Sequence, residues 1–228
     1  MSSSDNRGGM KITMIRHGQP MHVETKDGTP ANPDLSPLGR EQAEAVAEWL
    51  QTERFHRIYA SPLKRAYQTA MPLSKQLGLE IESRDYLKEI DHSQDNYVPL
   101  ETLKIIDYDR WYKMMQGDFG YEVSFQDFSK VVAAGMKELV SENRGKHIAI
   151  FCHAGVINAF ASYIIGFEPK LFFAPEYTGI SRFAIASSGE KSVLTLNEAI
   201  HLEHRRGNER FFASRGKTSE GAAVSGRH

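Results

Sequence analysis

The sequence predicts an α/β protein, a three-layer sandwich whose mostly parallel central sheet carries helices on both faces. From residue 11 to about residue 200, short apolar runs alternate with amphipathic segments, which is the pattern of strand–helix repeats. The run at 147–152 is almost continuously apolar, as expected for a strand that is buried on both faces. Ser-Pro pairs at 36–37 and 61–62 are typical helix starts, with serine as N-cap and proline in the first turn.

Each expected element follows from local pattern. The expected strands are 11–15, 57–60, 79–81, 147–152, 181–186 and 193–196. The expected helices run from Ser36 to Leu50, from Ser61 to a stop at Gly78, from Ser124 to Val140, and from Val156 to a stop at Gly166. Ser124 and Asp127 resemble a capping box.

One domain is expected, covering residues 10–203. Residues 1–9 are rich in serine and glycine and predict a disordered N-terminus, and residues 204–228 predict a mobile C-terminal tail. Residues 90–122 are first polar and then amphipathic. We interpret them as an irregular insertion with some helix that could cover a site.

Composition excludes several classes of partner. The chain has 228 residues and a formal net charge of −1, which favours neither nucleic acid nor an anionic membrane. The single cysteine, Cys152, allows no intramolecular disulfide, no apolar stretch reaches the ~20 residues of a membrane span, and the N-terminal residues do not resemble a signal peptide. We therefore expect a cytoplasmic protein. Its oligomeric state stays open, a dimer included, because Phe172 and Phe173 fit either an interface or the core.

Cationic and imidazole side chains follow several strands at the point where each strand ends. Arg16 and His17 follow the first strand, His153 follows the strand 147–152, and Arg65 lies in the first turn of the helix after the strand 57–60. Because ligands bind at the carboxyl ends of parallel strands, we expect these side chains to meet in one cleft.

The chemistry that this cleft suits is an anionic, tetrahedral ligand. Two guanidinium groups match phosphate oxygens, and the helix start after His153 offers free N–H groups. One neutral imidazole could attack phosphorus while the other, protonated, stabilises the oxygens. A leaving alkoxide needs a proton, and Glu89 is the best-placed carboxyl group.

Five segments, in order, resemble the motifs of the histidine phosphatase superfamily, also called phosphoglycerate mutase-like. Arg-His-Gly at 16–18 is similar to its signature, and Cys-His-Ala-Gly at 152–155 is similar to its second-histidine block. The other three are residues 35–43, 59–70 and 87–89. The resemblance implies a parallel-rich sheet between helices and hydrolysis of phosphomonoesters through a phosphohistidine.

The resemblance also implies a role for each matching residue. His17 would be the phosphorylated nucleophile, His153 would assist it, and Glu89 would be the acid for the leaving group and the base for water. The substrate-binding residues would be Arg16, Arg65, Gln19 and Ala154, the last through its backbone N–H. The partner would be a small phosphorylated substrate.

Departures from the family pattern bear on the reaction. Pro20 stands where the sugar-phosphate mutases have a hydroxyl residue, and Val23 takes the place of an asparagine. Because proline offers neither hydroxyl nor backbone N–H, a phosphate contact is lost. We therefore predict a phosphatase; the alternatives are a phosphoglycerate-type phosphomutase and a non-catalytic phospho-ligand or protein-binding module. The family's Gly-Trp-Glu-Gly is replaced by residues 93–96, so the substrate side is unusual.

Some charged residues have two interpretations. Asp91 and His92 could be an acid pair in the pocket, but a solvated loop is favoured. Arg110 and Lys113 could contact a charged substrate, but a helix surface is favoured.

No metal and no cofactor are expected. His201 and His204 have a spacing that zinc can use, but no further ligand block accompanies them. The sequence leaves open whether Arg182 faces the cleft or solvent.

Overall fold

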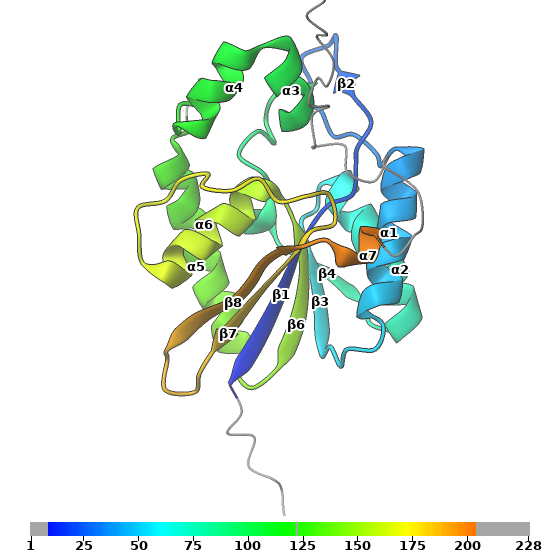
Figure 1. Ribbon diagram of the computed structural model, residues 1–228, viewed down its shortest axis with the longest axis vertical. Helices are drawn as coiled ribbons and strands as arrows, with labels where there is room; N and C mark the ends of the chain where they lie inside the picture. The colour runs from blue at the N-terminus through cyan, green and yellow to red at the C-terminus, as the bar shows by residue number, and fades with distance from the viewer. Residues whose placement is uncertain (1–8, 122, 204–228) are drawn as a thin grey trace, which may run out of the picture.

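The computed structural model describes residues 9–121 and 123–203, and its centre is a six-stranded sheet (Figure 1). The strand order is β4-β3-β6-β1-β7-β8. The strands are β1 Met10–Arg16, β3 Arg57–Ala60, β4 Ile81–Ser83, β6 His147–Cys152, β7 Ile180–Ile185 and β8 Lys191–Glu198. The first four in this order are parallel, whereas β7 and β8 each run antiparallel to the preceding strand. The predicted mostly parallel sheet is therefore confirmed.

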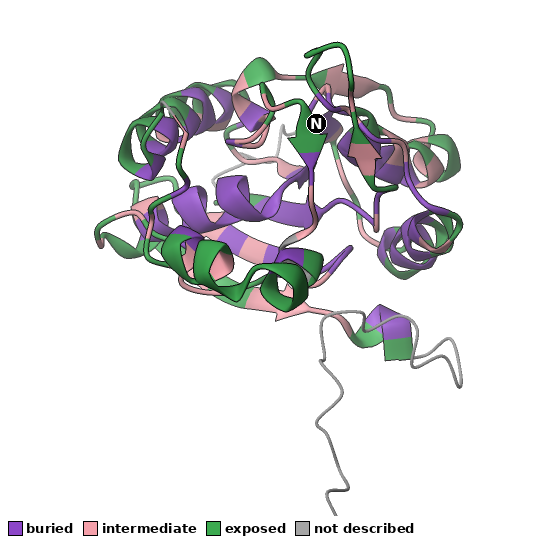
Figure 2. Ribbon diagram, turned by 90° about the horizontal axis from the view of Figure 1, so that it is seen from above, coloured by how far each residue is buried: buried purple, intermediate pink, exposed green. Residues whose placement is uncertain are grey.

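Helices cover both faces of this sheet, as predicted. The helices α1 Pro37–Leu50 and α2 Lys64–Leu77 pack on one face, and α5 Phe125–Glu142 and α6 Ala154–Ile165 pack on the other. A short helix, α7 Ile200–Glu203, lies against α1. Figure 2 looks onto the molecule from above and shows buried central strands between the two helical layers.

Alternation along the strands builds the two cores. In β1, Ile12 and Met14 join the cluster formed with α5 and α6, whereas Ile15 joins the cluster formed with α1 and α2. Successive side chains of a strand point to opposite faces, and helices cover both faces of this sheet. All three residues are therefore fully buried. Phe172 and Phe173 pack, partly buried, against the first of these clusters.

Several predicted helix ends are confirmed. The Ser36 hydroxyl accepts the Gly39 N–H at 3.0 Å, with proline in the first turn of α1. The Ser124 hydroxyl accepts the Asp127 N–H at the start of α5. Gly166 ends α6 in the left-handed conformation, with φ of 89°.

The predicted start of the next helix at Ser61 is wrong. The helix α2 begins at Lys64, and its N-cap, Leu63, has no side-chain hydrogen bond. The Ser61 hydroxyl lies 2.9 Å from the His153 ring, so a long-range contact uses the group that was expected to cap. The strand expected at 79–81 lies at Ile81–Ser83, because the chain still closes the end of α2 through the Leu79 N–H and the Ser74 carbonyl.

The segment 90–122 contains more regular structure than expected. It holds β5 Asn96–Tyr97, α3 Leu100–Ile106 and α4 Tyr108–Met115. The strand β5 pairs with β2 Val23–Glu24 in a second, two-stranded sheet. A 3-10 turn at Asp85–Leu87 precedes the segment. In Figure 1 the two helices lie above the carboxyl ends of the parallel strands. The expectations for the chain ends fall on residues 1–8 and 204–228, outside the described residues.

A close approach of two backbones fixes the loop after β1. A Cβ on Gly39 would lie 2.0 Å from the Gln19 carbonyl oxygen, and one on Gly18 would lie 2.5 Å from the Gly39 carbonyl oxygen. Neither contact is sterically allowed, so the first turn of α1 seats this loop only because both residues are glycine.

We therefore expect Gly39→Ala to lower the free energy of unfolding by about 1–3 kcal/mol, because the added methyl group overpacks a backbone contact. Chemical denaturation monitored by circular dichroism measures this. The exposed neighbour supplies the matched control, since Arg40→Ala should change the stability by less than about 0.5 kcal/mol. Equal stability of the two variants would contradict the packing argument.

Candidate active site

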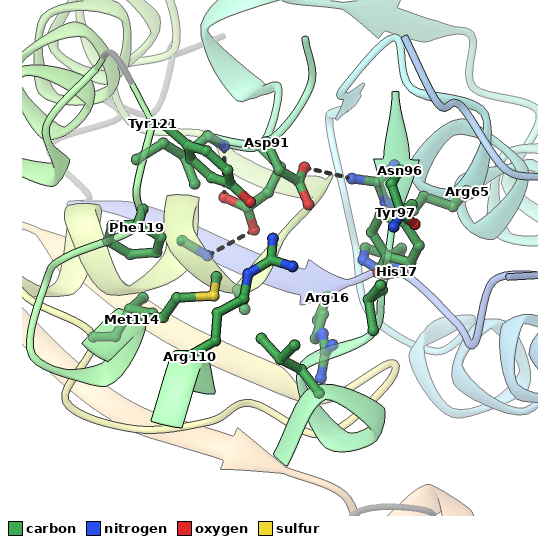
Figure 3. A pocket seen from close by; sticks show the side chains of 17 residues that line it. Arg16, His17, Arg65, Asp91, Asn96, Tyr97, Arg110, Met114, Phe119 and Tyr121 are labelled. Atoms are coloured by element: carbon green, nitrogen blue, oxygen red, sulfur yellow. Dashed lines mark hydrogen bonds and ion pairs between the residues drawn. The ribbon is translucent and has the colours of Figure 1, made fainter. Parts of the chain in front are cut away.

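A pocket lies at the carboxyl ends of the parallel strands, and Figure 3 shows the side chains that line it. Figure 1 shows α3 and α4 above these strand ends. Five residues expected at the site line it: Arg16, His17, Arg65, Glu89 and Ala154. They come from the end of β1, the start of α2, the loop after the 3-10 turn and the start of α6. The sequence-predicted convergence of these elements is therefore observed.

His17 is a buried, neutral imidazole with one defined tautomer. Its Nδ1 lies 2.8 Å from the Gly18 carbonyl oxygen, which can only accept, so Nδ1 carries the proton and Nε2 keeps its lone pair. Burial lowers the pKa of His17 well below its usual value, and Arg65 and Arg16 lower it further. Both properties are those of a nitrogen nucleophile.

His153 lies next to His17; it is fully buried and is not itself part of the pocket lining. The two ring centroids are 5.1 Å apart. Nε2 of His153 lies 2.9 Å from the Ser61 hydroxyl, whereas its Nδ1 is buried and has no hydrogen-bond partner among the described residues. A buried nitrogen of this kind is one that an oxyanion ligand would satisfy.

One imidazole of the pair was expected to be protonated, but the protein groups around His153 favour its neutral form. Burial lowers the pKa of His153 well below its usual value, and Arg65, His17 and Arg16 lower it further. A bound phosphoryl dianion would act in the opposite direction, because it favours the charged ring.

Two guanidinium groups are almost fully buried here. Arg16 is 3% exposed and Arg65 is 1% exposed. Nη1 of Arg16 donates to the Pro175 carbonyl at 2.6 Å, and its guanidinium lies over the Tyr177 ring. Since a buried cation needs compensation, such a pair is suited to hold an anion.

Arg65 has its own set of contacts. Its guanidinium lies 4.5 Å from the centre of the Tyr97 ring, and its Nη2 lies 3.4 Å from Oδ1 of Asp91. Its Nε is buried without a hydrogen-bond partner among the described residues. Arg65 therefore keeps hydrogen-bonding capacity for a ligand.

Glu89 is held at the start of α6. Its Oε2 accepts the Gly155 N–H at 2.9 Å, and its Oε1 accepts the Ile90 N–H at 3.0 Å. A Cβ on Gly155 would lie 2.2 Å from Oε1, so a side chain at this position would displace the Glu89 carboxylate. Burial, with the Asp91 carboxylate second, raises the pKa of Glu89 to about 7, which suits a group that gives and takes a proton near neutral pH.

Gln19, expected to bind substrate, does not line this pocket. Its side-chain oxygen accepts the Ser36 hydroxyl at 2.8 Å, and its N–H donates to Gln42. The structure thus places Gln19 as a link between the loop after β1 and the start of α1.

Two residues for which a surface position was favoured do line the pocket. Asp91 forms the ion pair with Arg65, and Arg110 of α4 directs its guanidinium into the pocket in Figure 3. The local sequence could not decide between pocket and surface for either residue, because both depend on how the segment 90–122 folds back over the sheet. Lys113, one turn further along α4, is not part of this lining.

Other candidates lie elsewhere. Arg182 forms ion pairs with Glu53 and Glu198, away from the pocket. His201 is buried against the Thr178 hydroxyl, and His204 falls outside the described residues. Within residues 9–121 and 123–203, no three histidine, cysteine or carboxylate side chains form a group that could hold a metal ion.

Comparison with known proteins gives the same family as the motifs. A sequence model of the histidine phosphatase superfamily (branch 1) matches residues 12–198. The chain is 28% identical over 205 residues to phosphoserine phosphatase 1 of Hydrogenobacter thermophilus, which covers 85% of this chain and 94% of that protein. It is 38% identical over 80 residues to the glucosyl-3-phosphoglycerate phosphatase of Mycobacterium tuberculosis, 35% of this chain and 36% of that one.

Solved structures agree with this. A mutant phosphoserine phosphatase from Entamoeba histolytica in complex with phosphoserine is 25% identical, with a TM-score of 0.68, and covers 85% of this chain and 99% of that chain. The chain therefore belongs to the histidine phosphatase superfamily. Its phosphatase relatives make it a phosphomonoester hydrolase of the histidine phosphatase type. None of the helices that the structure describes is long and apolar enough to span a bilayer.

Ser61, which the local pattern assigned to a helix cap, contacts the His153 ring through its hydroxyl. We expect Ser61→Ala to lower kcat/KM by about 10- to 100-fold, since a hydrogen bond that orients a buried, charge-stabilising imidazole is lost. Steady-state assays with an aryl phosphate measure this. Ser141→Ala, at an exposed position of α5, should leave the rate unchanged, and an equal loss in both variants would contradict the role of Ser61.

Proposed function

We propose that this chain hydrolyses small phosphomonoesters through a phosphohistidine on His17, without a metal ion. The observation that carries this is a neutral imidazole whose Nε2 is unprotonated and which lies within the field of two buried guanidinium groups. Glu89, in the same pocket, supplies a carboxyl group with a pKa of about 7.

In the first step, Nε2 of His17 attacks phosphorus as the bond from phosphorus to the ester oxygen breaks. The leaving alkoxide takes the proton of Glu89. The three phosphoryl oxygens are held by Arg16, Arg65 and His153, aided by the backbone N–H of Ala154. These contacts strengthen as charge develops on the oxygens, which lowers the barrier.

In the second step, the Glu89 carboxylate takes a proton from water, and the water oxygen attacks phosphorus. The bond between phosphorus and Nε2 breaks, inorganic phosphate leaves, and His17 returns to its neutral form. Each proton that Glu89 gives in the first step is recovered in the second, so the cycle closes without a cofactor.

The pocket also favours a substrate with a second acidic group. Away from the groups that would hold the phosphoryl group, the pocket lining is largely apolar and includes Leu103, Met114 and Phe119. Arg110 supplies a cation in this part of the pocket. Relatives are named for phosphoserine and for glucosyl-3-phosphoglycerate, both of which carry a carboxylate. We assign this carboxylate to Arg110, on the side of the pocket away from His17.

Hydrolysis is favoured over the mutase alternative. Pro20 is buried and forms an isolated backbone bridge with Leu35, so the loop after His17 presents no hydroxyl there to bind a second phosphate. The cytoplasm suits this enzyme, since its one cysteine, Cys152, is a buried thiol whose pKa is raised by burial.

We expect His17→Ala to abolish turnover and phosphoenzyme formation, because no other described imidazole in the pocket has a free, oriented Nε2. Rapid quenching with ³²P-labelled substrate should trap an acid-labile, base-stable phosphoenzyme in the wild type only. His22→Ala, at an exposed histidine nearby, is the control and should retain activity. Addition of EDTA should change nothing, and wild-type turnover in His17→Ala would end the proposal.

For the substrate, we expect Arg110→Gln to raise KM for phosphoserine and 3-phosphoglycerate by about three- to tenfold, because an exposed guanidinium–carboxylate contact is lost. The KM for p-nitrophenyl phosphate, which has no carboxylate, should stay the same. Lys113→Gln is the matched control on α4. A uniform change across all three substrates would contradict the assignment.

A further inference from the structure

The pocket contains two carboxyl groups, although the reaction needs only one proton donor. Asp91 and Glu89 both line it, and they are the only acidic side chains among the described residues that do. Asp91 is largely buried, with 19% of its side chain exposed. A second buried carboxyl group beside the first is costly unless it has a purpose, because two like charges repel in a site that excludes water.

The two carboxyl groups have unequal partners. Asp91 lies 3.4 Å from a permanent cation, Nη2 of Arg65, whereas Glu89 accepts only neutral backbone N–H groups, those of Ile90 and Gly155. The guanidinium stabilises charge on Asp91 more than the N–H groups stabilise charge on Glu89. When two neighbouring carboxyl groups share one proton, the proton resides on the group whose negative charge is stabilised less by its partners.

We propose that Asp91 is a positioning residue for the proton: its negative charge, anchored on Arg65, keeps Glu89 protonated and ready for the leaving group. This inference rests on the proposed role of Glu89 as the general acid. Asp91 itself touches neither phosphorus nor the leaving oxygen in this scheme, and acts only through Glu89.

Charged and titratable groups face this pair from several elements of the pocket. They are Arg16 at the end of β1, His17 after β1, Arg65 of α2, Tyr97 of β5, Arg110 of α4, Tyr121 after α4, His92 in the same loop, and Cys152 and His153 at the end of β6. Burial raises the pKa of Tyr121 to about 12 and also raises that of Cys152, so both stay neutral near pH 7. His17 and His153 are neutral for the reasons given above.

The remaining charged groups therefore determine which of the two carboxyl groups holds the proton. Burial is the largest cause that raises the pKa of Glu89, Asp91 is the second, and Arg65 acts in the opposite direction. Burial raises the pKa of Asp91 as well, and Arg65 is the first of the groups that lower it. Held by this cation, the Asp91 carboxylate favours the acid form of Glu89. Arg65 serves two groups, since it holds Asp91 and remains close enough to bind the phosphoryl group.

The test is the pH dependence of kcat/KM in Asp91→Asn, with two leaving groups. For glycerol 2-phosphate, whose alkoxide must be protonated, the rate falls as pH rises through the pKa of Glu89. Loss of the Asp91 charge should move this fall in kcat/KM, the basic limb of the pH profile, to lower pH by about one unit. At pH values above the limb, kcat/KM should then be about tenfold lower than in the wild type. For p-nitrophenyl phosphate, whose leaving group needs no proton, the rate should change little.

Three variants control the test. Asp95→Asn alters an exposed carboxylate in the same loop and should leave the limb in place. Glu89→Gln should remove the basic limb and lower kcat/KM selectively for glycerol 2-phosphate. In this Glu89→Gln background, Asp91→Asn should cause no further shift of the pH profile. Asp91→Ser, which removes the same charge with a smaller side chain, should shift the limb as Asp91→Asn does. Thermal unfolding and vanadate affinity check that each variant is folded.

The outcomes separate the two proposals. If Glu89→Gln handles the alkyl substrate as the wild type does, then the proposed role of Glu89 fails and this inference fails with it. If Glu89→Gln loses the alkyl substrate but both Asp91 variants keep the wild-type limb, only the inference is overturned. A rate loss that is equal at every pH and for both leaving groups would make Asp91 merely structural, and it would overturn the inference as well.

Discussion

Burial of two guanidinium groups at one end of the sheet is the constraint on which the rest of the structure depends. Arg16 and Arg65 are almost inaccessible to water, so their charge must be met from within the protein. A backbone carbonyl, the faces of two tyrosine rings and one carboxylate contribute to this. Burial lowers the pKa of both neighbouring imidazoles, and the same two charges lower it further. A phosphoryl dianion is the kind of ligand that two buried guanidinium groups at one site suit.

Backbone contacts hold these groups in place. The loop after β1 lies directly against the first turn of α1 because Gly18 and Gly39 carry no side chains, and the carboxylate of Glu89 reaches α6 because Gly155 carries none. Through these contacts, three elements that are remote in sequence present their functional atoms with little freedom. The pocket is therefore preorganised by packing rather than by the ligand.

Much of the fold could be predicted from sequence, because its signals are local. The apolar runs, the cap at Ser36 and the stop at Gly166 depend on residues within one or two turns. The positions of the arginines and histidines followed from a general rule on strand ends. Ser61 was misassigned because its local pattern suits a cap while its hydroxyl serves a ring 92 positions away. Asp91 and Arg110 were assigned to the surface because nothing local indicates how the segment 90–122 folds over the pocket.

The small sheet formed by β2 and β5 joins the loop after β1 to the segment 90–122. Just after the nucleophile loop, residues 23–24 pair with residues 96–97, and the neighbouring N–H groups of Thr25 and Ala31 donate to carbonyls at 95 and 94. The segment 90–122, which would contact the organic part of a substrate, is thus hydrogen-bonded through its backbone to the residues that follow His17. Transplanting the segment 90–122 between homologues to exchange selectivity would consequently require the 20–35 stretch to be transplanted along with it.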